Sequence, residues 1–260
     1  MGEIIACANQ KGGVGKTTTV VNLATYLALN GLRVLIVDLD PQGNATMGSG
    51  IDKRKLAKTI YQVLLGTTTL SEARLRSPHG GFDVVPANRE LAGAEVEMVD
   101  LPQRETRLTT ALATAASEYD FVLIDCPPAL NLLTVNALCA ADAVMIPMQC
   151  EYYALEGLSD LVNTIKKVRA HLNPRLEIEG LLRTMFDTRN TLAMQVSEQL
   201  QSHFGDKVYR TVIPRNVRLA EAPSHGMPIL KYDRQSKGAL AYLALAGEIL
   251  QKRSHTTGGN

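Results

Sequence analysis

The sequence turns from a strand to a helix at residues 10–18, which read Gln10-Lys11-Gly12-Gly13-Val14-Gly15-Lys16-Thr17-Thr18. An apolar run, Ile4 to Ala8, precedes this stretch, and a helix-compatible segment, Thr18 to Leu29, follows it. A glycine-rich turn between a strand and a helix is the setting of a phosphate-binding loop. Its glycines let backbone N–H groups converge on an anion, and the helix N-terminus adds partial positive charge. The stretch therefore predicts a phosphate site at the centre of the fold.

This loop contains two lysines. Lys16, directly after Gly15, is expected to contact the β- and γ-phosphates of a nucleotide, and the Thr17 hydroxyl is expected to bind Mg²⁺. The general pattern, G-x-x-x-x-G-K-[ST], has a glycine where this chain has Gln10, and an additional lysine, Lys11, follows it. The loop therefore offers two lysines to one triphosphate. The residue types and their spacing do not decide the role of Lys11.

Further apolar runs recur along the chain with helix-compatible stretches between them. Including the first, they are Ile4–Ala8, Val34–Val37, Phe82–Val85, Phe121–Ile124, Ala143–Ile146, Ile178–Met185 and Val208–Ile213. Several are continuously apolar rather than alternating, as expected when helices cover both faces of a sheet. The pattern predicts an α/β fold with a doubly wound, mostly parallel sheet. We expect a single domain over residues 1–253 and a disordered polar tail over 254–260.

Acidic residues follow two of these predicted strands. Ligands of such sheets bind outside the carboxyl ends of the strands. Asp38 and Asp40 follow the second run, and Asp125 follows Phe121–Ile124 in a Walker B arrangement that places a carboxylate beside the metal, usually through a water. Asp40 is then available to orient an attacking water in line with the γ-phosphate. Asp38 is also compatible with a turn or helix-capping role.

Composition and charge place few limits on function. The formal net charge is +1 and hydrophobic residues make up 45% of the chain, which excludes a mainly disordered protein and does not by itself indicate a nucleic-acid binder. The charges are unevenly distributed, however. Residues 1–165 hold 12 Lys and Arg against 18 Asp and Glu, whereas residues 166–260 hold 15 against 8. The basic C-terminal third is typical either of a polyanion-binding face or of solvated surface lysines.

The cysteines indicate a reducing compartment. All four lie in apolar segments without C-x-x-C spacing, which predicts buried free thiols: Cys7, Cys126, Cys139 and Cys150. The sequence shows no cleavable leader and no uninterrupted apolar run of about 18 residues. We therefore expect a soluble cytoplasmic protein with no membrane partner.

Several motifs together resemble the ParA family of chromosome-partitioning ATPases, in its Soj-type branch, within the deviant Walker A class that also contains MinD. They are Lys11–Thr18, Asp38–Asn44 and Asp125–Pro128, together with Gln149–Gly157 and Ile213–Gly226, the last two being more specific to the partitioning branch. The likeness extends from Ile4 to about Leu250. It covers nearly the whole chain.

The resemblance implies a Mg²⁺-dependent ATPase that works as a dimeric switch in chromosome or plasmid partitioning. Lys11 would cross to the phosphates bound by the second subunit, so that ATP bridges a homodimer, and Gly12 would lie at the same interface. Catalysis would then involve Lys11, Lys16 and Asp40. ATP is favoured over GTP because the chain lacks the Asn-Lys-x-Asp segment that commonly reads guanine. The implied nucleotide contacts, with the last two near adenine, are Lys11, Gly12, Gly13, Val14, Gly15, Lys16, Thr17, Thr18, Pro214 and Asn216.

The same resemblance implies that the ATP-bound dimer holds non-specific double-stranded DNA on a surface containing Arg189 and Arg218. Lys231, Arg234 and Lys237 are further candidates, and the basic C-terminal third supports this placement. Contacts to phosphates make such binding independent of sequence and steeply dependent on salt. A ParB-type centromere-binding protein would stimulate hydrolysis, and the protein would associate with the nucleoid.

Two other classes of protein contain the same kind of phosphate-binding loop and are alternative interpretations. A reductase similar to the nitrogenase iron protein needs cysteines that hold an iron–sulfur cluster between two subunits, and Cys126 and Cys139 are the only conceivable pair. A membrane-surface positioning ATPase of the MinD type needs a C-terminal amphipathic helix that binds lipid. Residues Gly238–Leu250 are apolar nearly all round and lack a basic face, which favours a helix packed in the core.

Overall fold

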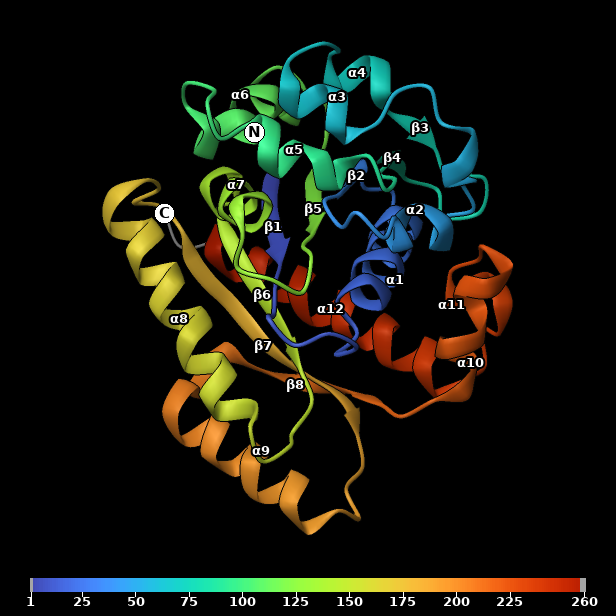
Figure 1. Cartoon of the computed structure of the whole chain (residues 1–260). Helices are drawn as coiled ribbons and strands as arrows, with labels where there is room; N and C mark the ends of the chain where they lie inside the picture. Colours follow the sequence, from blue (N-terminus) through green and yellow to red (C-terminus); the bar gives the residue numbers. More distant parts are fainter. Residues whose placement is uncertain (1, 258–260) are drawn as a thin grey trace.

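Eight strands form one sheet in the computed structural model, which describes residues 2–257 (Figure 1). The strands lie in the order β3-β4-β2-β5-β1-β6-β7-β8, and every neighbouring pair is parallel except β3 with β4. Their bounds are β1 Glu3–Cys7, β2 Val34–Asp38, β3 Leu75–Arg76, β4 Asp83–Val85, β5 Phe121–Asp125, β6 Ala143–Met148, β7 Glu177–Phe186 and β8 Val208–Pro214. The strand that precedes the glycine-rich loop, β1, is therefore central.

The α-helices connect these strands and flank the sheet. They are α1 Lys16–Leu29, α2 Asn44–Gly48, α3 Ile60–Leu65, α4 Leu70–Ala73, α5 Leu91–Glu97, α6 Arg107–Ala113, α7 Leu132–Ala140, α8 Ala154–His171, α9 Thr191–Phe204, α10 Val217–Glu221, α11 Ile229–Tyr232 and α12 Lys237–Thr257. Short 3₁₀ turns are η1 Lys53–Lys55, η2 Arg104–Thr106, η3 Ala116–Glu118, η4 Gly205–Lys207 and η5 Ala222–His225. None of the helices within residues 2–257 combines the length and apolar character of a membrane span.

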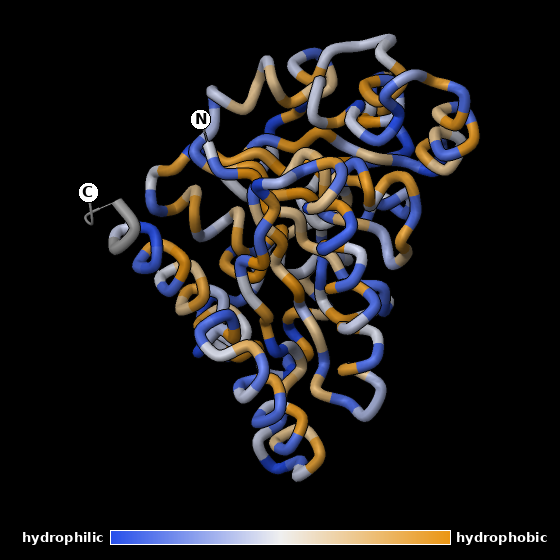
Figure 2. Tube along the Cα trace, turned by 90° about the vertical axis from the view of Figure 1, so that its left-hand side faces the viewer, coloured by the Kyte–Doolittle hydropathy of each residue, from blue (hydrophilic) through white to orange (hydrophobic). Residues whose placement is uncertain are grey.

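The sheet separates two hydrophobic cores. Successive residues of β1 point to opposite faces, so Ile4 and Ala6 belong to one core and Ile5 and Cys7 to the other. The first core is covered by helices α3 to α9, and the second by α1, α2 and α10 to α12. Figure 2 shows the central strands mostly apolar and the surrounding helices alternating between apolar and polar residues. The predicted doubly wound α/β fold is confirmed.

The structure differs from the sequence expectations at two places. The strand β3 was not expected, because its two residues, Leu75 and Arg76, are both exposed and show no apolar pattern. Helix α12 continues through Thr257, so residues 254–257 of the expected tail are helical, and residues 258–260 lie outside the described residues. Neither glycine nor proline interrupts the chain between Gly247 and Gly258, so nothing in the local sequence ends the helix earlier.

A side chain of α12 caps backbone N–H groups of the edge strand β8. Its register against β7 shifts between the pairs formed by Leu181 and Arg183, so the strand bulges there. The Glu248 carboxylate of α12 accepts hydrogen bonds from the backbone N–H groups of Arg210 (2.8 Å) and Thr211 (2.9 Å).

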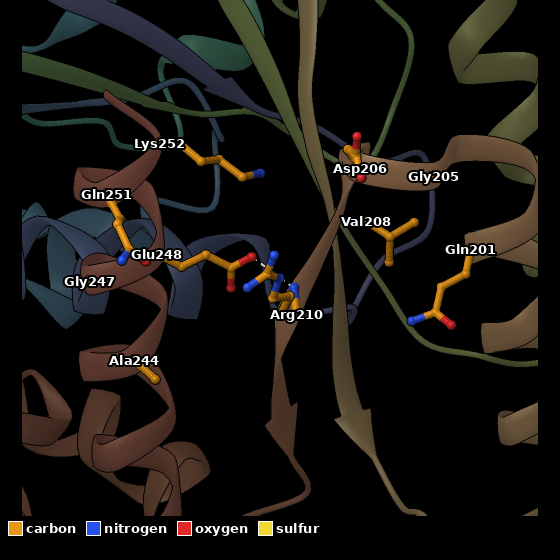
Figure 3. Close-up of a pocket in the computed structure, with 10 residues that line it drawn as sticks. All are labelled: Gln201, Gly205, Asp206, Val208, Arg210, Ala244, Gly247, Glu248, Gln251 and Lys252. Carbon is orange, nitrogen blue, oxygen red and sulfur yellow. Dashed lines mark hydrogen bonds between the residues drawn. The ribbon is translucent and has the colours of Figure 1, made fainter. Parts of the chain in front are cut away.

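A cavity of about 900 Å³ opens beside strand β8, with Gln201 of α9 on one side and Glu248 of α12 on the other (Figure 3). The floor of this cavity is strand β8.

Both alternatives of the sequence analysis meet structural obstacles. All four cysteines are buried free thiols, as predicted, and Cys126 and Cys139 are 1% and 7% exposed. Thiols enclosed in one chain are poorly placed to share a cluster with a second chain. On α12, Tyr242, Leu245 and Ile249 are buried against the sheet. The apolar face of this helix therefore packs against the core and is not available to a lipid surface.

A partly buried ionic cluster connects α12 to the amino ends of two strands. Arg253 forms ion pairs with Glu3 of β1 and with Glu179 of β7, the latter at 3.3 Å. Burial raises the pKa of Glu3 from 4.5 to about 7; Arg253 lowers it, whereas Glu179 and Asp142 raise it. Because the pKa of Glu3 is higher in the folded chain than in the unfolded one, the folded chain holds an additional proton between these values. Stability therefore falls as pH rises from about 4.5 to 7.

Replacing Glu3 by glutamine is expected to stabilise the protein at pH 8 by about 1–2 kcal/mol and to change little at pH 4.5. The neutral amide keeps the shape of the side chain without the cost of a buried charge near Glu179 and Asp142. Urea unfolding at both pH values measures the difference. Glu177→Gln, which removes the same charge from an exposed position of β7, is the control and should show no such pH dependence. Equal effects of Glu3→Gln at both pH values would contradict the role of this ionisation.

Candidate functional site

The glycine-rich loop joins β1 to α1 and is anchored to two other strands. The Asn9 side chain donates to the Pro147 carbonyl of β6 (2.8 Å) and accepts from the Lys11 N–H (3.0 Å). The Thr184 hydroxyl of β7 donates to the Val14 carbonyl (2.7 Å). Gly15 has φ +88°, a left-handed conformation that favours glycine. The loop is therefore held open by the sheet itself.

The N-terminus of α1 is suited to an anion. Gly15 caps the helix without a side-chain acceptor, and no acidic residue lies in the first turn. The first N–H groups of a helix have no partner within it, so they point toward the loop with the positive end of the helix dipole. Lys16 is 7% exposed, and its ammonium donates to the Lys11 carbonyl (3.0 Å) across the loop. The N-terminus of α1 and the Lys16 ammonium thus lie together at the loop.

A carboxylate lies behind this helix N-terminus. Asp125, at the end of β5, is fully buried, and its Oδ2 accepts a hydrogen bond from the Thr17 hydroxyl (2.7 Å). Its second oxygen, Oδ1, has no hydrogen-bond partner among residues 2–257. Burial raises the pKa of Asp125, and the neighbouring Asp38 raises it further. A buried carboxylate oxygen without a donor is well suited to a cation or to a water held by one.

The two aspartates after β2 have different surroundings. Asp38 is fully buried and accepts hydrogen bonds from the Thr46 N–H (2.8 Å) and hydroxyl (2.7 Å), which anchors α2. Burial raises the pKa of Asp38 to about 6. Asp40 is 8% exposed, and its Oδ1 accepts from the Gln42 N–H (2.9 Å) in a tight turn. Asp38 is thus the structural member of the pair, and Asp40 lies in the adjoining turn.

Lys11 faces away from the loop that contains it. Its side chain is about half exposed and forms an ion pair with Glu151, which follows β6. Gly12 is also unconfined within its own chain: a Cβ there would make only ordinary contact, 3.9 Å from the Pro128 side chain. The two lysines of the loop therefore occupy different environments, one enclosed and one on the surface.

Comparisons with known proteins identify the family. Residues 2–178 match a family described as an AAA domain. The chain is 56% identical to the sporulation initiation inhibitor protein Soj of Bacillus subtilis over 249 residues, with 96% of this chain and 98% of Soj covered. It is 53% identical to the chromosome partitioning protein ParA of Caulobacter vibrioides, with 96% and 94% covered. The chain belongs to the ParA/Soj family of chromosome-partitioning ATPases.

A solved structure supports the same fold. The cobyrinic acid a,c-diamide synthase of Mycobacterium smegmatis, determined with bound ADP and magnesium, aligns with a TM-score of 0.86 and 39% identity. The alignment covers 100% of this chain and 97% of that one. The resemblance to the ParA/Soj family that the motifs indicated is confirmed.

Beside the loop of this ParA/Soj-family chain lies a cavity of about 390 Å³. It adjoins α1, α2 and η5, and its lining residues are Thr17, Thr18, Val21, Asn22, Asn44, Met47, Gly48, Ala222, Pro223, Ser224 and Met227. Pro214 ends β8, and Asn216 caps α10 by accepting from the Leu219 N–H (3.2 Å). Neither of them lines this cavity, and their contact with adenine stays a prediction.

The basic residues expected to touch DNA follow the carboxyl ends of neighbouring strands. Arg189 lies between β7 and α9 and pairs with Asp187 (2.8 Å). Arg218 lies on α10 after β8 and pairs with Glu221 (2.9 Å) and Asp233 (3.5 Å). Three further basic residues are exposed: Lys231 on α11, Arg234 between α11 and α12, and Lys237 at the start of α12. All five residues are on the surface.

Sequence reasoning missed three residues that position the ParA/Soj loops. Glu151 pairs with Lys11, Thr184 holds the Val14 carbonyl, and Lys53 donates to the Gln42 carbonyl beside Asp40. Glu151 and Thr184 follow or end strands that reach the same edge of the sheet as the loop, which is a signal that was available. Lys53 gives no such signal, because it lies in the short 3₁₀ turn η1 after α2 and follows no strand.

Proposed function

We propose that this chain is an ATP-gated switch for chromosome or plasmid partitioning. ATP joins two copies into a homodimer, the dimer binds non-specific double-stranded DNA on the nucleoid in the cytoplasm, and hydrolysis to ADP and phosphate releases it. A ParB-type centromere-binding protein stimulates that hydrolysis. The curated relatives that match over nearly their whole length include partitioning proteins, which supports the biological setting.

The observation that carries the proposal is the separation of the two loop lysines. Lys16 is enclosed and directed across the loop, where it serves the phosphates of its own chain. Lys11 is on the surface, paired only with an exposed carboxylate. When a second copy approaches this face, Lys11 of the first copy can therefore contact the nucleotide bound by the second. The open space at Gly12 supports the same approach, because its own chain gives no reason to exclude a side chain there.

The loop also fits the nucleotide and its metal. The related structure from Mycobacterium smegmatis holds ADP and magnesium. In this chain the free Oδ1 of Asp125 and the Thr17 hydroxyl are the groups that would hold Mg²⁺, Asp125 through a water. The metal, when bound, offsets phosphate charge. The Thr17 hydroxyl would keep its hydrogen bond to Asp125 while its oxygen lone pairs face the metal.

Asp40 is the residue proposed to orient the attacking water. Its carboxylate lies in the turn after β2, at the same edge of the sheet as the loop and Asp125. Phosphoryl transfer needs positioning more than base strength, because its transition state is loose. In the single chain the Gln42 N–H holds Oδ1 of Asp40, which orients the carboxylate and leaves Oδ2 to accept from a water. Slow intrinsic hydrolysis is expected because the proposed site is completed only across the dimer.

Wild type and Lys11→Ala, each with no nucleotide, ADP or ATP, test the switch. Light scattering gives the mass, and fluorescence anisotropy with an arbitrary duplex gives DNA binding at two salt concentrations. Wild type should dimerise and bind DNA only with ATP, and should lose affinity as salt rises. Lys11→Ala should still bind ATP yet remain monomeric. Equal DNA affinity of wild type with ATP, with ADP and without nucleotide would refute the proposal.

Replacing Arg218 by alanine is expected to weaken DNA binding of the dimer at least tenfold at 0.1 M salt and to reduce the magnitude of the slope of log K against log salt by about two. The reason is the loss of one phosphate contact per subunit. Arg33→Ala is the matched control, since Arg33 is exposed beside Asp120 at the opposite edge of the sheet. Equal losses in both variants would mean that only net charge matters.

A further inference from the structure

A carboxylate covers Arg189, one of the two arginines that are proposed to contact DNA. Its guanidinium makes a two-point contact with Asp187, with 3.0 Å from Nε to Oδ1 and 2.8 Å from Nη2 to Oδ2. The Arg189 N–H donates to the same carboxylate (3.0 Å). These hydrogen bonds lower the pKa of Asp187 to about 2, so its carboxylate is charged at neutral pH. Arg189 is therefore already paired before DNA arrives.

The second arginine, Arg218, is held from two sides. Its Nη1 lies 2.9 Å from Oε2 of Glu221, and its Nε lies 3.5 Å from Oδ2 of Asp233. The Tyr232 hydroxyl donates to the same oxygen of Glu221 (3.0 Å), and the Tyr232 ring stacks on His225 with 5.0 Å between the ring centroids. The Glu221 carboxylate is thereby positioned on the guanidinium.

These contacts reverse the local charge. Two guanidinium groups face three carboxylates, which leaves an excess of one negative charge. A phosphate uses the same fork of N–H donors that a carboxylate uses. DNA therefore has to displace the carboxylates, which then lie close to its phosphates. An exposed ion pair shifts an equilibrium by only a few-fold, so the displacement is unfavourable but possible.

Both arginines follow the same edge of the sheet. Phe186 pairs with Pro214 where β7 and β8 end, so Asp187 and Arg189 come after one strand and Arg218 after its neighbour (Figure 1). A single chain thus offers the duplex two paired arginines. Two chains joined as a dimer offer twice as many contacts, and the second set binds without a further loss of translational freedom.

We propose that Asp187, Glu221 and Asp233 inhibit the DNA surface of the single chain. They compete with DNA phosphates for Arg189 and Arg218, so one chain alone binds DNA too weakly to stay bound. The two subunits of the ATP-bound dimer displace the carboxylates together. This inference rests on the proposed function, and it names the contacts that make DNA binding depend on dimerisation.

DNA affinity of the full chain, measured by fluorescence anisotropy with an arbitrary duplex at 0.1 M salt, tests the competition. Glu221→Gln and Asp187→Asn keep the acceptor oxygens and remove the charges. Each should raise the affinity of the ATP-bound dimer at least about threefold, because every dimer contains two copies. The double variant should gain at least about tenfold and should also bind DNA with ADP, where wild type does not.

The matched control is the double variant Glu177→Gln/Asp206→Asn. It removes the same two charges from exposed positions at the amino ends of β7 and β8. Glu177 lies about 30 Å from the other end of its ten-residue strand, well beyond the screening length of about 10 Å at 0.1 M salt. This control should change DNA affinity less than about twofold.

A mutant cycle shows whether the gain passes through the arginines. In an Arg218→Ala background, Glu221→Gln should give no more gain than the control, and Asp187→Asn should behave likewise in an Arg189→Ala background. The double variant Asp187→Asn/Glu221→Gln should also show a steeper decrease of log K with log salt, because displaced carboxylates of wild type take up cations. Equal gains with and without the arginines would assign the effect to net charge and overturn the inference.

The outcomes separate this inference from the proposed function, and unchanged ATP affinity verifies that each variant is folded. If wild type binds DNA only with ATP and the double variant Asp187→Asn/Glu221→Gln binds no more tightly, the inference fails and the proposed function stands. If that double variant binds DNA while wild type binds it with no nucleotide, the competition is supported and the proposed function fails. No DNA binding by either protein would overturn both.

Discussion

Replacing Asp40 by alanine should leave ATP bound and almost unhydrolysed, with kcat lowered at least 100-fold, or about 2.7 kcal/mol in the barrier. Within residues 2–257 the Asp40 side chain forms no hydrogen bond or ion pair with the loop, and its only hydrogen bond is accepted from the Gln42 N–H. Its removal therefore spares the phosphate ligands. Because release from DNA depends on hydrolysis in the proposed cycle, the variant should also accumulate as an ATP-bound dimer on DNA.

Single-turnover hydrolysis, ATP affinity and the lifetime of the DNA complex measure these effects separately. Asp40→Asn is the matched variant, since it keeps the hydrogen bond to Gln42 and the size of the side chain while removing the charge. It should be as slow as Asp40→Ala. An asparagine variant that retains wild-type kcat would show that the charge has no part in orienting the water. A loss of ATP affinity in both variants would place Asp40 among the binding groups instead.

Replacing Lys16 by alanine should lower ATP affinity at least 100-fold and abolish both dimerisation and DNA binding. Charged hydrogen bonds contribute about 1.5–3 kcal/mol each, and Lys16 is expected to make more than one to the β- and γ-phosphates. No other ammonium is enclosed in the loop, because Lys11 is directed to Glu151. Nucleotide binding should therefore have no substitute for it.

Fluorescent-nucleotide titration gives the affinity, and urea unfolding without nucleotide shows whether the variant remains folded. Lys11→Ala is the matched control from the same loop and should keep nearly wild-type ATP affinity. If Lys16→Ala retains affinity and Lys11→Ala loses it, the roles of the two lysines within one chain are reversed.

The sequence predicted those parts of the fold and site whose pattern is local. The apolar runs, the glycines at 12, 13 and 15 and the aspartates that end β2 and β5 each report on their own neighbourhood. The side-chain contacts of the loop were not predictable in this way. Thr184 reaches Val14 across 170 positions, and Glu151 reaches Lys11 across 140. Such pairs depend on the strand order, which places β6 beside β1 and β7 next to β6.

The misses have the same physical origin. Strand β3 consists of two exposed residues, so it carries no apolar signal and exists only because β4 offers it a partner. Lys53 contacts Gln42 because a glycine at position 43 lets its stem pack on the backbone. The roles of Asp40, Pro214, Asn216 and the DNA-facing arginines remain predictions, since each concerns a ligand rather than the chain itself.

The capped edge at β8 has a consequence for crowded conditions. In the proposed function many copies gather on one stretch of DNA and reach a high local concentration, at which an exposed strand edge would pair with the backbone of a neighbouring copy. The Glu248 carboxylate already occupies two backbone donors at that edge, and the opposite edge is the two-residue strand β3. Irreversible strand-to-strand assembly is thereby discouraged at both ends of the sheet. In the proposed cycle, copies then associate only through the face that contains the nucleotide, where ATP hydrolysis reverses the contact.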